Sequence, residues 1–199
     1  DEGKKAFYEA LMQDVRDRKV DATWKQVLYV LLEKPKPNNP EVVSERREIA
    51  LMAQEMKLLL KMVRDVSYQR VLGRVISAQA GWLTGFGCTD PALVAAALIQ
   101  QQRRLQRPLY LLYIDLSTFF PKLDRQVVRY AEMIHGLPEE VSDLVALIYG
   151  EATNRDDCVE CRYDSEAGLG DPFKNYMGAL MGCVLSPDRA KLVLNTVVA

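Results

Sequence analysis

The chain has 199 residues, of which 49% are hydrophobic, so it can bury a sizeable core and is not disordered, collagen-like or a disulfide scaffold. Its longest apolar runs, 92–99 and 109–114, are much shorter than the roughly 20 residues that span a bilayer, and residues 1–9 lack a signal-peptide pattern. We therefore expect an intracellular protein, cytoplasmic or nuclear, without a membrane partner, and a formal net charge of −1 weakly disfavours a free-standing nucleic-acid binder.

The first third of the chain predicts a helix, a strand and a second helix. Apolar residues at helical spacing predict a helix over 4–19, and the short apolar run 27–32 predicts a strand. Prolines and asparagines between 35 and 40 predict a turn, which presents Lys34 near a loop tip. Apolar residues from 49 to 63 recur at three- and four-residue steps, which predicts one long amphipathic helix with Ser44 as its N-cap.

The middle of the chain predicts a loop, a helix and a buried strand. Glycines and aromatic residues in 81–87 indicate an ordered, packed loop. Thr89 is expected to cap a helix that runs through Arg104 and that Pro108 ends. The continuous apolar run 109–114 is typical of a strand covered on both faces, and it ends at Asp115.

The last third predicts helices around a hairpin. Helices are expected at 125–134 and 139–149, a loose hairpin from 158–163 and 173–176, and a final helix that begins at Ser186 and Pro187. Mixed helices and strands around one small sheet make the fold class α+β.

Asp115 is the sharpest chemical signal in the residues themselves. A carboxylate at the exit of a buried strand emerges at the rim of the sheet, where open sheets hold ligands and metal ions. The alternative is structural, because Asp is favoured in turns and Asp115 could cap the turn through Ser117 and Thr118.

The surroundings of Asp115 resemble a known family. The segment 111–120, an apolar strand ending in Asp115 with the aromatic Phe120 five residues on, resembles the first palm motif of reverse transcriptases. Other blocks of that family appear in the same order: 24–34 like the fingers strand, 46–51 like "R-x-I-x-L", 76–90 like "Q-x-G-F … T-D", and 178–187 like "G-x-x-Q-G-x-x-x-S-P". The resemblance covers about residues 20–199 and points to the non-LTR retrotransposon, or LINE-like, type.

The resemblance implies a polymerase fingers–palm fragment that is helix-rich, with a fingers-like region at 1–108 and a partial palm at 109–199. The implied activity is that of an RNA-directed DNA polymerase, which uses two Mg²⁺ ions, an RNA template, a DNA primer and dNTPs. In this family the residue at Asp115 binds both metals and is catalytic. The implied substrate-binding residues are Lys34 and Arg47 on the triphosphate, Phe120 under the sugar, and Met181 and Gly182 in the floor of the pocket.

The sequence departs from the family's pattern at three places. Met181 stands where the family usually has Gln and cannot make the amide's hydrogen bonds, and Pro121 replaces a common Asp. No paired-Asp turn follows Ser186 and Pro187, so we expect these residues alone to be inactive and the complete parent protein to be the enzyme. The alternative is a degenerate, non-catalytic remnant that keeps the fold as a binding or interaction module.

Cysteines and charged residues leave further alternatives. Four cysteines suggest reduced thiols, although Cys158 and Cys161 could form half of a zinc site with Cys183 or His135. Arg47 could instead pair with Glu48, Lys34 could be a solvated loop residue, and Phe120 could be an ordinary core residue.

Overall fold

The computed structural model describes residues 2–34, 46–75, 79–82, 85–150, 155–165 and 168–198. The predicted turn at 35–40 and the cap Ser44 lie outside these residues. The elements in chain order are α1 (Glu2–Arg16), η1 (Ala22–Lys25), β1 (Gln26–Glu33), β2 (Arg46–Met52), α2 (Gln54–Val63), η3 (Arg64–Tyr68), α3 (Gln69–Leu72), α4 (Thr89–Arg104), α5 (Phe119–Lys122), α6 (Arg125–Ile134), α7 (Glu139–Tyr149), η4 (Arg155–Asp157), β3 (Val159–Ser165), β4 (Gly168–Leu169), β5 (Phe173–Asn175) and α8 (Ser186–Val198).

One small mixed sheet joins the two halves of the chain. Its order is β2-β1-β3-β4, with β5 also paired to β3. β1 and β2 are antiparallel, whereas β1 and β3 are parallel, so that Val27 lies opposite Met52 on one side and Cys161 on the other. The predicted α+β class is confirmed at this level, and strands from both sides of residue 108 share the sheet.

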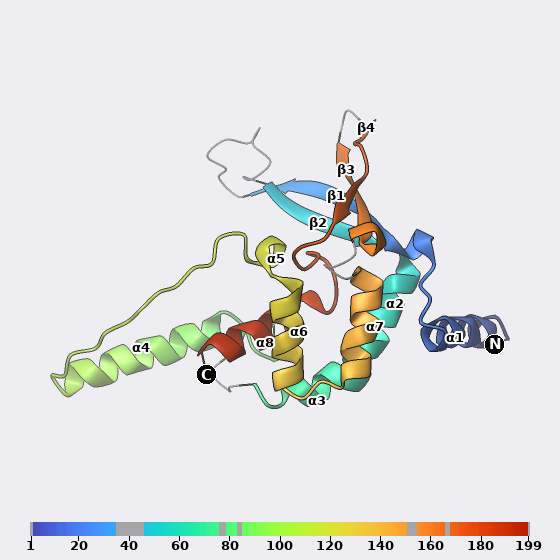
Figure 1. Cartoon of the computed structure of the whole chain (residues 1–199). Coiled ribbons are helices and arrows are strands. Elements are labelled where there is room, and N and C mark those ends of the chain that lie inside the picture. Colours follow the sequence, from blue (N-terminus) through green and yellow to red (C-terminus); the bar gives the residue numbers. More distant parts are fainter. Residues whose placement is uncertain are drawn as a thin grey trace.

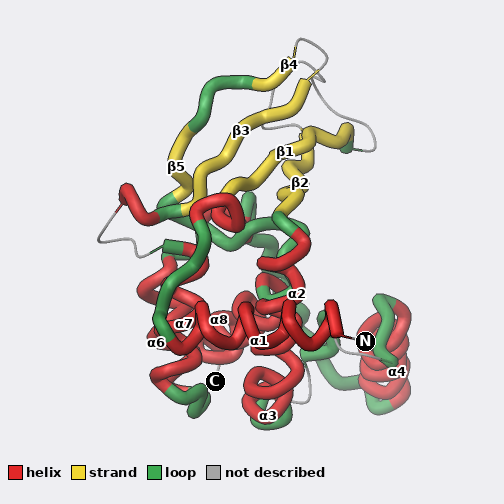
Figure 2. Tube along the Cα trace, turned by 90° about the vertical axis from the view of Figure 1, so that its right-hand side faces the viewer, coloured by secondary structure: helices red, strands yellow, loops and turns green. Residues whose placement is uncertain are grey.

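The helices form a layer beneath the sheet (Figures 1 and 2). The inner face of the sheet, including Val27, Ala50 and Val159, is buried against helices α2, α6, α7 and α8. Helix α8 is the most enclosed, with Leu192 and Ala190 at 0% exposure. In both views α4 stands apart from this body.

Most predicted helices and the predicted hairpin are confirmed. Helices α4, α6 and α7 have the expected bounds, although the N-cap of α4 is Cys88 and not Thr89, and α1, β1 and α8 lie where the pattern placed them. Helix α6 begins at Arg125 because the Asp124 carboxylate accepts hydrogen bonds from the backbone N–H groups of Gln126 and Val127. β3 and β5 form the antiparallel hairpin, with Cys161 opposite Phe173.

The long helix predicted from residue 49 is wrong in its first part. Arg46–Met52 is strand β2, and the helix begins only at Gln54. Ala50 and Met52 are buried while Leu51 is exposed, which is the two-residue period of a strand. Pairing with β1 therefore outweighs the helical spacing that Ile49 and Met52 share with α2.

The strand predicted at 109–114 is also wrong. Residues 107–116 form no helix or strand, and Tyr110 and Tyr113 are 90% and 84% exposed. A strand needs hydrogen-bond partners, and no described strand of the sheet pairs with this run. Asp115 consequently does not end a buried central strand; it is exposed in an extended segment.

No helix within the described ranges combines the length and the apolar character needed to cross a membrane.

Candidate functional site

The loop that joins β5 to α8 lies against the free edge of β2. The backbone N–H of Ala50 donates to the carbonyl oxygen of Met181 at 2.6 Å. Gly182 follows with a φ of +109°, and a Cβ at this position would lie 2.7 Å from the Ala50 carbonyl oxygen. Glycine is therefore required here, both for its backbone conformation and for the close approach of the two chains.

The same loop is bonded to α5 at its other end. The backbone N–H of Ala179 donates to Phe120 O at 2.8 Å, and that of Gly178 donates to Leu123 O at 2.9 Å. A Cβ on Gly178 would lie 2.4 Å from the carbonyl oxygen of Pro121. The loop thus bridges β2, which carries Arg47, and α5, which carries Phe120.

Phe120 lies in a small aromatic cluster. Its ring meets Trp82 edge to face at a centroid distance of 5.6 Å and Phe119 at 5.8 Å. Phe120 is half-buried and packs against the core. Trp82 comes from the third sequence block, so this block, the α5 segment and the loop meet at one place.

The two predicted cations belong to the β1–β2 hairpin. Arg47 is exposed and lies opposite Leu32 in the antiparallel register, so both side chains are on the same face of the sheet. Lys34 follows Leu32 by two residues and is partly buried. The hairpin therefore carries both cations at one end of the sheet, and the alternative ion pair of Arg47 with Glu48 is not formed.

Glu48 is instead held on the inner face. The Tyr163 hydroxyl donates to Glu48 Oε1 at 2.9 Å, and Asn175 Nδ2 donates to the Tyr29 hydroxyl at 2.8 Å. Burial, followed by the hydrogen bond to Glu48, raises the pKa of Tyr163 to about 12. Tyr29, Glu48, Asn175 and Met181 line a cavity of about 30 Å³, which is room for one or two water molecules.

Asp115 is the predicted residue that the structure does not bring into this cluster. It is exposed and precedes Phe120 along an extended segment. Within the described residues, no group of three His, Cys, Asp or Glu side chains lies close enough to hold a metal ion. Asp115 alone does not supply the ligands that two Mg²⁺ ions require.

The zinc alternative gains no support from the geometry. Cys158, Cys161 and Cys183 are buried as free thiols. Within the described residues, these thiols and His135 form no group that could hold a metal ion, and burial raises the pKa of Cys161 to about 12.

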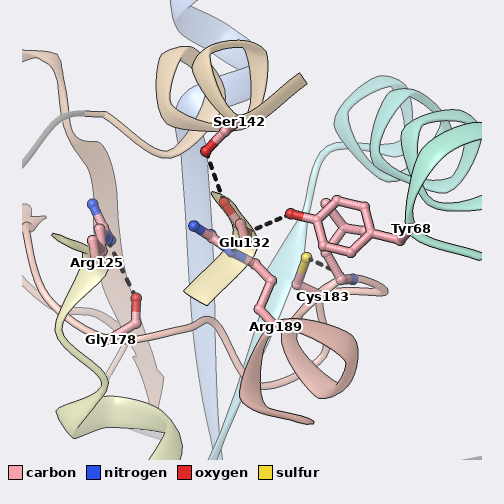
Figure 3. A network of polar contacts seen from close by, with 8 residues as sticks. Tyr68, Arg125, Glu132, Ser142, Gly178, Cys183 and Arg189 are labelled. Carbon is pink, nitrogen blue, oxygen red and sulfur yellow. Dashed lines mark hydrogen bonds and ion pairs between the residues drawn. The ribbon is translucent and has the colours of Figure 1, made fainter. Parts of the chain in front are cut away.

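Arg125 was not singled out in the sequence, but its side chain joins the segments that lie next to the loop at 178–185 (Figure 3). Its guanidinium is buried and donates to the carbonyl oxygens of Gly178 at 3.3 Å, Tyr149 at 3.0 Å and Asn175 at 2.9 Å. It forms no ion pair with a carboxylate of the described residues, and burial lowers its pKa. A single Arg at the start of a helix carries no sequence signal for this role.

A second buried network fixes helix α8, which follows the loop (Figure 3). Glu132 accepts hydrogen bonds from the hydroxyls of Tyr68 and Ser142 and pairs with Arg189, whose Nε lies 2.7 Å from Glu132 Oε1. Burial alone would lower the pKa of Arg189, but the Glu132 carboxylate together with Tyr68 and Tyr149 outweighs burial and raises that pKa. Helices α6, α7 and α8 and segment η3 are thereby tied together, and the end of the loop is held in place.

Comparison with known proteins found no family model and no curated protein sequence that matches this chain.

Proposed function

We propose that this chain is a segment of an RNA-directed DNA polymerase of the LINE-like type. The observation that supports the proposal most is the convergence of separate sequence blocks on the loop at 178–185. Met181 O accepts from Ala50 N of β2, the strand that carries Arg47, and Ala179 N donates to Phe120 O. The blocks 46–51 and 111–120 therefore both contact the block 178–187, whereas Asp115 itself lies outside this cluster.

In this proposal the cluster forms one wall of a nucleotide pocket. Arg47 and Lys34 supply positive charge for a triphosphate, and a guanidinium can fork two phosphate oxygens. Phe120 lies under the sugar, and Gly182 lets the backbone approach the base closely. Residues 1–108 serve as the fingers and 109–199 as part of the palm.

The proposed metal ligand in these residues is Asp115. In the complete parent enzyme, two Mg²⁺ ions would stabilise the attacking and leaving oxygens of nucleotide transfer to a primer 3′-OH. Because Asp115 is a single exposed carboxylate here, we assign no catalytic step to the 199 residues alone.

Primer extension by the complete parent protein tests the proposal. The assay contains an RNA template, a DNA primer, dNTPs and Mg²⁺, and it compares the parent with Asp115→Asn and with Asp171→Asn, an exposed loop carboxylate, as the matched control. We expect extension by the parent and by Asp171→Asn, and none by Asp115→Asn. Extension that survives Asp115→Asn would contradict the assignment of this residue.

The second candidate is a non-catalytic remnant that binds nucleic acid. The presence of Met181 in place of the family's usual Gln favours it, because a thioether cannot make the amide's hydrogen bonds. A parent protein that binds the RNA–DNA hybrid in a fluorescence anisotropy assay but never extends the primer would support this candidate over the first.

A further inference from the structure

Residues 107–116, here called the strap, expose an unusual amount of apolar surface. Tyr110, Leu112 and Ile114 are 90%, 84% and 76% exposed. A soluble domain rarely leaves such a contiguous apolar segment in water unless another surface covers it. We therefore expect another surface to cover the apolar side chains of the strap.

The sheet does not cover the strap in this structure. No described strand pairs with residues 107–116, and at the outer edge of β2 the backbone N–H of Ala50 is already bonded to Met181.

Helix α6 carries an apolar face that no described element covers. Val127, Tyr130, Met133 and Ile134, here called the α6 stripe, are exposed by 49%, 62%, 50% and 53%. They follow one another at helical spacing on one side of α6. The opposite side, with Val128 and Ala131, packs into the core.

The backbone at both ends of the strap is in a strained conformation. Gln106 and Thr118 have φ values of +50° and +52°, which a β-branched residue such as Thr rarely adopts. Helix α4, which leads into the strap, has no buried residue, and Figure 1 shows it projecting from the body. No residue of α4 or of the strap belongs to the buried core, so a change in the position of the arm that they form breaks no core packing.

We infer that the strap closes onto the α6 stripe of the same chain. Helix α6 is about 15 Å long at 1.5 Å per residue, and five extended residues, 112–116, span about 17 Å. Because only residues 117–124, which include α5, separate the strap from the start of α6, the tether is short and the effective concentration of one surface at the other is high.

In an extended chain, successive side chains point to opposite faces, and this alternation determines which side chains of the strap contact α6. Leu112, Ile114 and Leu116 share one face, and Asp115 lies on the other. Closure buries the first face on the α6 stripe and fixes the Asp115 carboxylate relative to Phe120. The inference therefore bears on the proposed function, but it does not depend on it.

Disulfide trapping in the purified 199-residue chain tests the closure. In a Cys88→Ser background, which removes the exposed thiol, Ile114→Cys is combined with Tyr130→Cys on the α6 stripe or with Val66→Cys, a 65% exposed control on η3. We expect the first pair to form an intramolecular disulfide at least about tenfold faster than the control pair, in a monomer and independently of protein concentration. Equal rates would overturn the inference, and so would disulfides that form only between chains, because they indicate arm exchange between copies.

Chymotrypsin provides a second readout that needs no cysteine. The enzyme cleaves after Tyr110, Leu112 and Tyr113, and closure slows it by covering the strap. Tyr130→Asp places a charge in the α6 stripe at a position that is 62% exposed, so the variant is expected to fold and to be cleaved several-fold faster in the strap. Cleavage at an unchanged rate in folded Tyr130→Asp contradicts closure.

Discussion

The backbone N–H of Ala50 donates to the carbonyl oxygen of Met181 at 2.6 Å. This bond joins the edge of β2, the strand that carries Arg47, to the loop before α8, which carries Gly182. This contact is made by backbone groups, so it does not depend on the side chain of Met181.

Gly182→Ala should destabilise the protein. The residue has a φ of +109°, and the new Cβ would lie 2.7 Å from Ala50 O, so the loop must move or strain. We expect a loss of roughly 1 to 3 kcal/mol in the free energy of unfolding, measured by urea denaturation. Gly81→Ala is the matched control, because nothing lies within 4 Å of its Cβ and its φ is ordinary. Equal stability of the two variants would refute the close approach.

Arg125→Ala should cost considerably more. It removes a buried guanidinium and leaves the carbonyl oxygens of Gly178, Tyr149 and Asn175 without a donor. We expect a loss of about 3 kcal/mol or more in urea denaturation, with little rescue by Lys, because an ammonium cannot reach the same set of carbonyls.

Arg129→Ala is the control for Arg125, since it removes the same charge from the same helix. Arg129 pairs with Asp143 near the surface, with about a third of its side chain exposed. We expect a loss of about 1 kcal/mol or less. If the two variants lose the same stability, then the buried contacts of Arg125 contribute no more than a surface ion pair.

Glu132 and Arg189 should show strong coupling. Either Glu132→Gln or Arg189→Met leaves the partner's charge buried without compensation, because these side chains are 0% and 6% exposed. Each single change should cost roughly 3 to 5 kcal/mol, and the double variant Glu132→Gln/Arg189→Met should cost clearly less than the sum. The double-mutant cycle is measured by urea denaturation, and additive losses would mean that the pair does not interact.

Stability should fall at alkaline pH, in part through Tyr163. Its pKa is raised from 10.0 to about 12, so between these values the folded protein keeps a proton that the unfolded chain loses. The contribution is complete below pH 10 and is lost as the pH rises to about 12. In urea midpoints measured across this range, Tyr163→Phe should show a shallower decline than the wild type. Tyr110→Phe, which alters a 90% exposed residue, should follow the wild type.

Much of the fold could be predicted because local signals and tertiary packing agree. Helices α6 and α7 are bounded by Asp124, Gly136 and Pro138, which act within a few residues, and their apolar faces match the core. The two wrong predictions concern segments whose secondary structure depends on pairing with another strand. Residues 46–52 have helical spacing yet pair with β1, and residues 109–114 have strand character yet find no partner in the sheet.

The candidate site could be predicted only in part, for the same reason. The structure shows that Gly182 allows a close backbone approach to Ala50, whereas the motif at 178–187 predicts an approach to the substrate, and that role stays a prediction. The contacts of Arg125 and Glu132 depend on helices that meet only in the folded chain, and no spacing in the sequence encodes them. The motif around Asp115 is visible in the sequence, but the position of its carboxylate in the folded chain depends on the conformation of the strap.

The variant Phe120→Ala distinguishes a role of this ring in packing from a role in substrate selection. Its ring packs on Trp82 and Phe119 and is half-buried, so Phe120→Ala should cost about 2 kcal/mol in urea denaturation, less than a fully buried Phe. Under the proposed function, the same change also opens the space that excludes a 2′-hydroxyl. The complete parent enzyme should then incorporate rNTPs more readily relative to dNTPs.

Phe119→Ala is the control for this prediction, because it removes the neighbouring ring of the same cluster. It should lower stability to a similar degree but leave the ratio of kcat/KM for rNTP and dNTP unchanged, since a packing defect alone does not distinguish the two sugars. Single-nucleotide primer extension at varied rNTP and dNTP gives both ratios. A rise in the ratio for Phe120→Ala alone assigns the ring to the sugar, whereas equal ratios in both variants leave Phe120 as a packing residue.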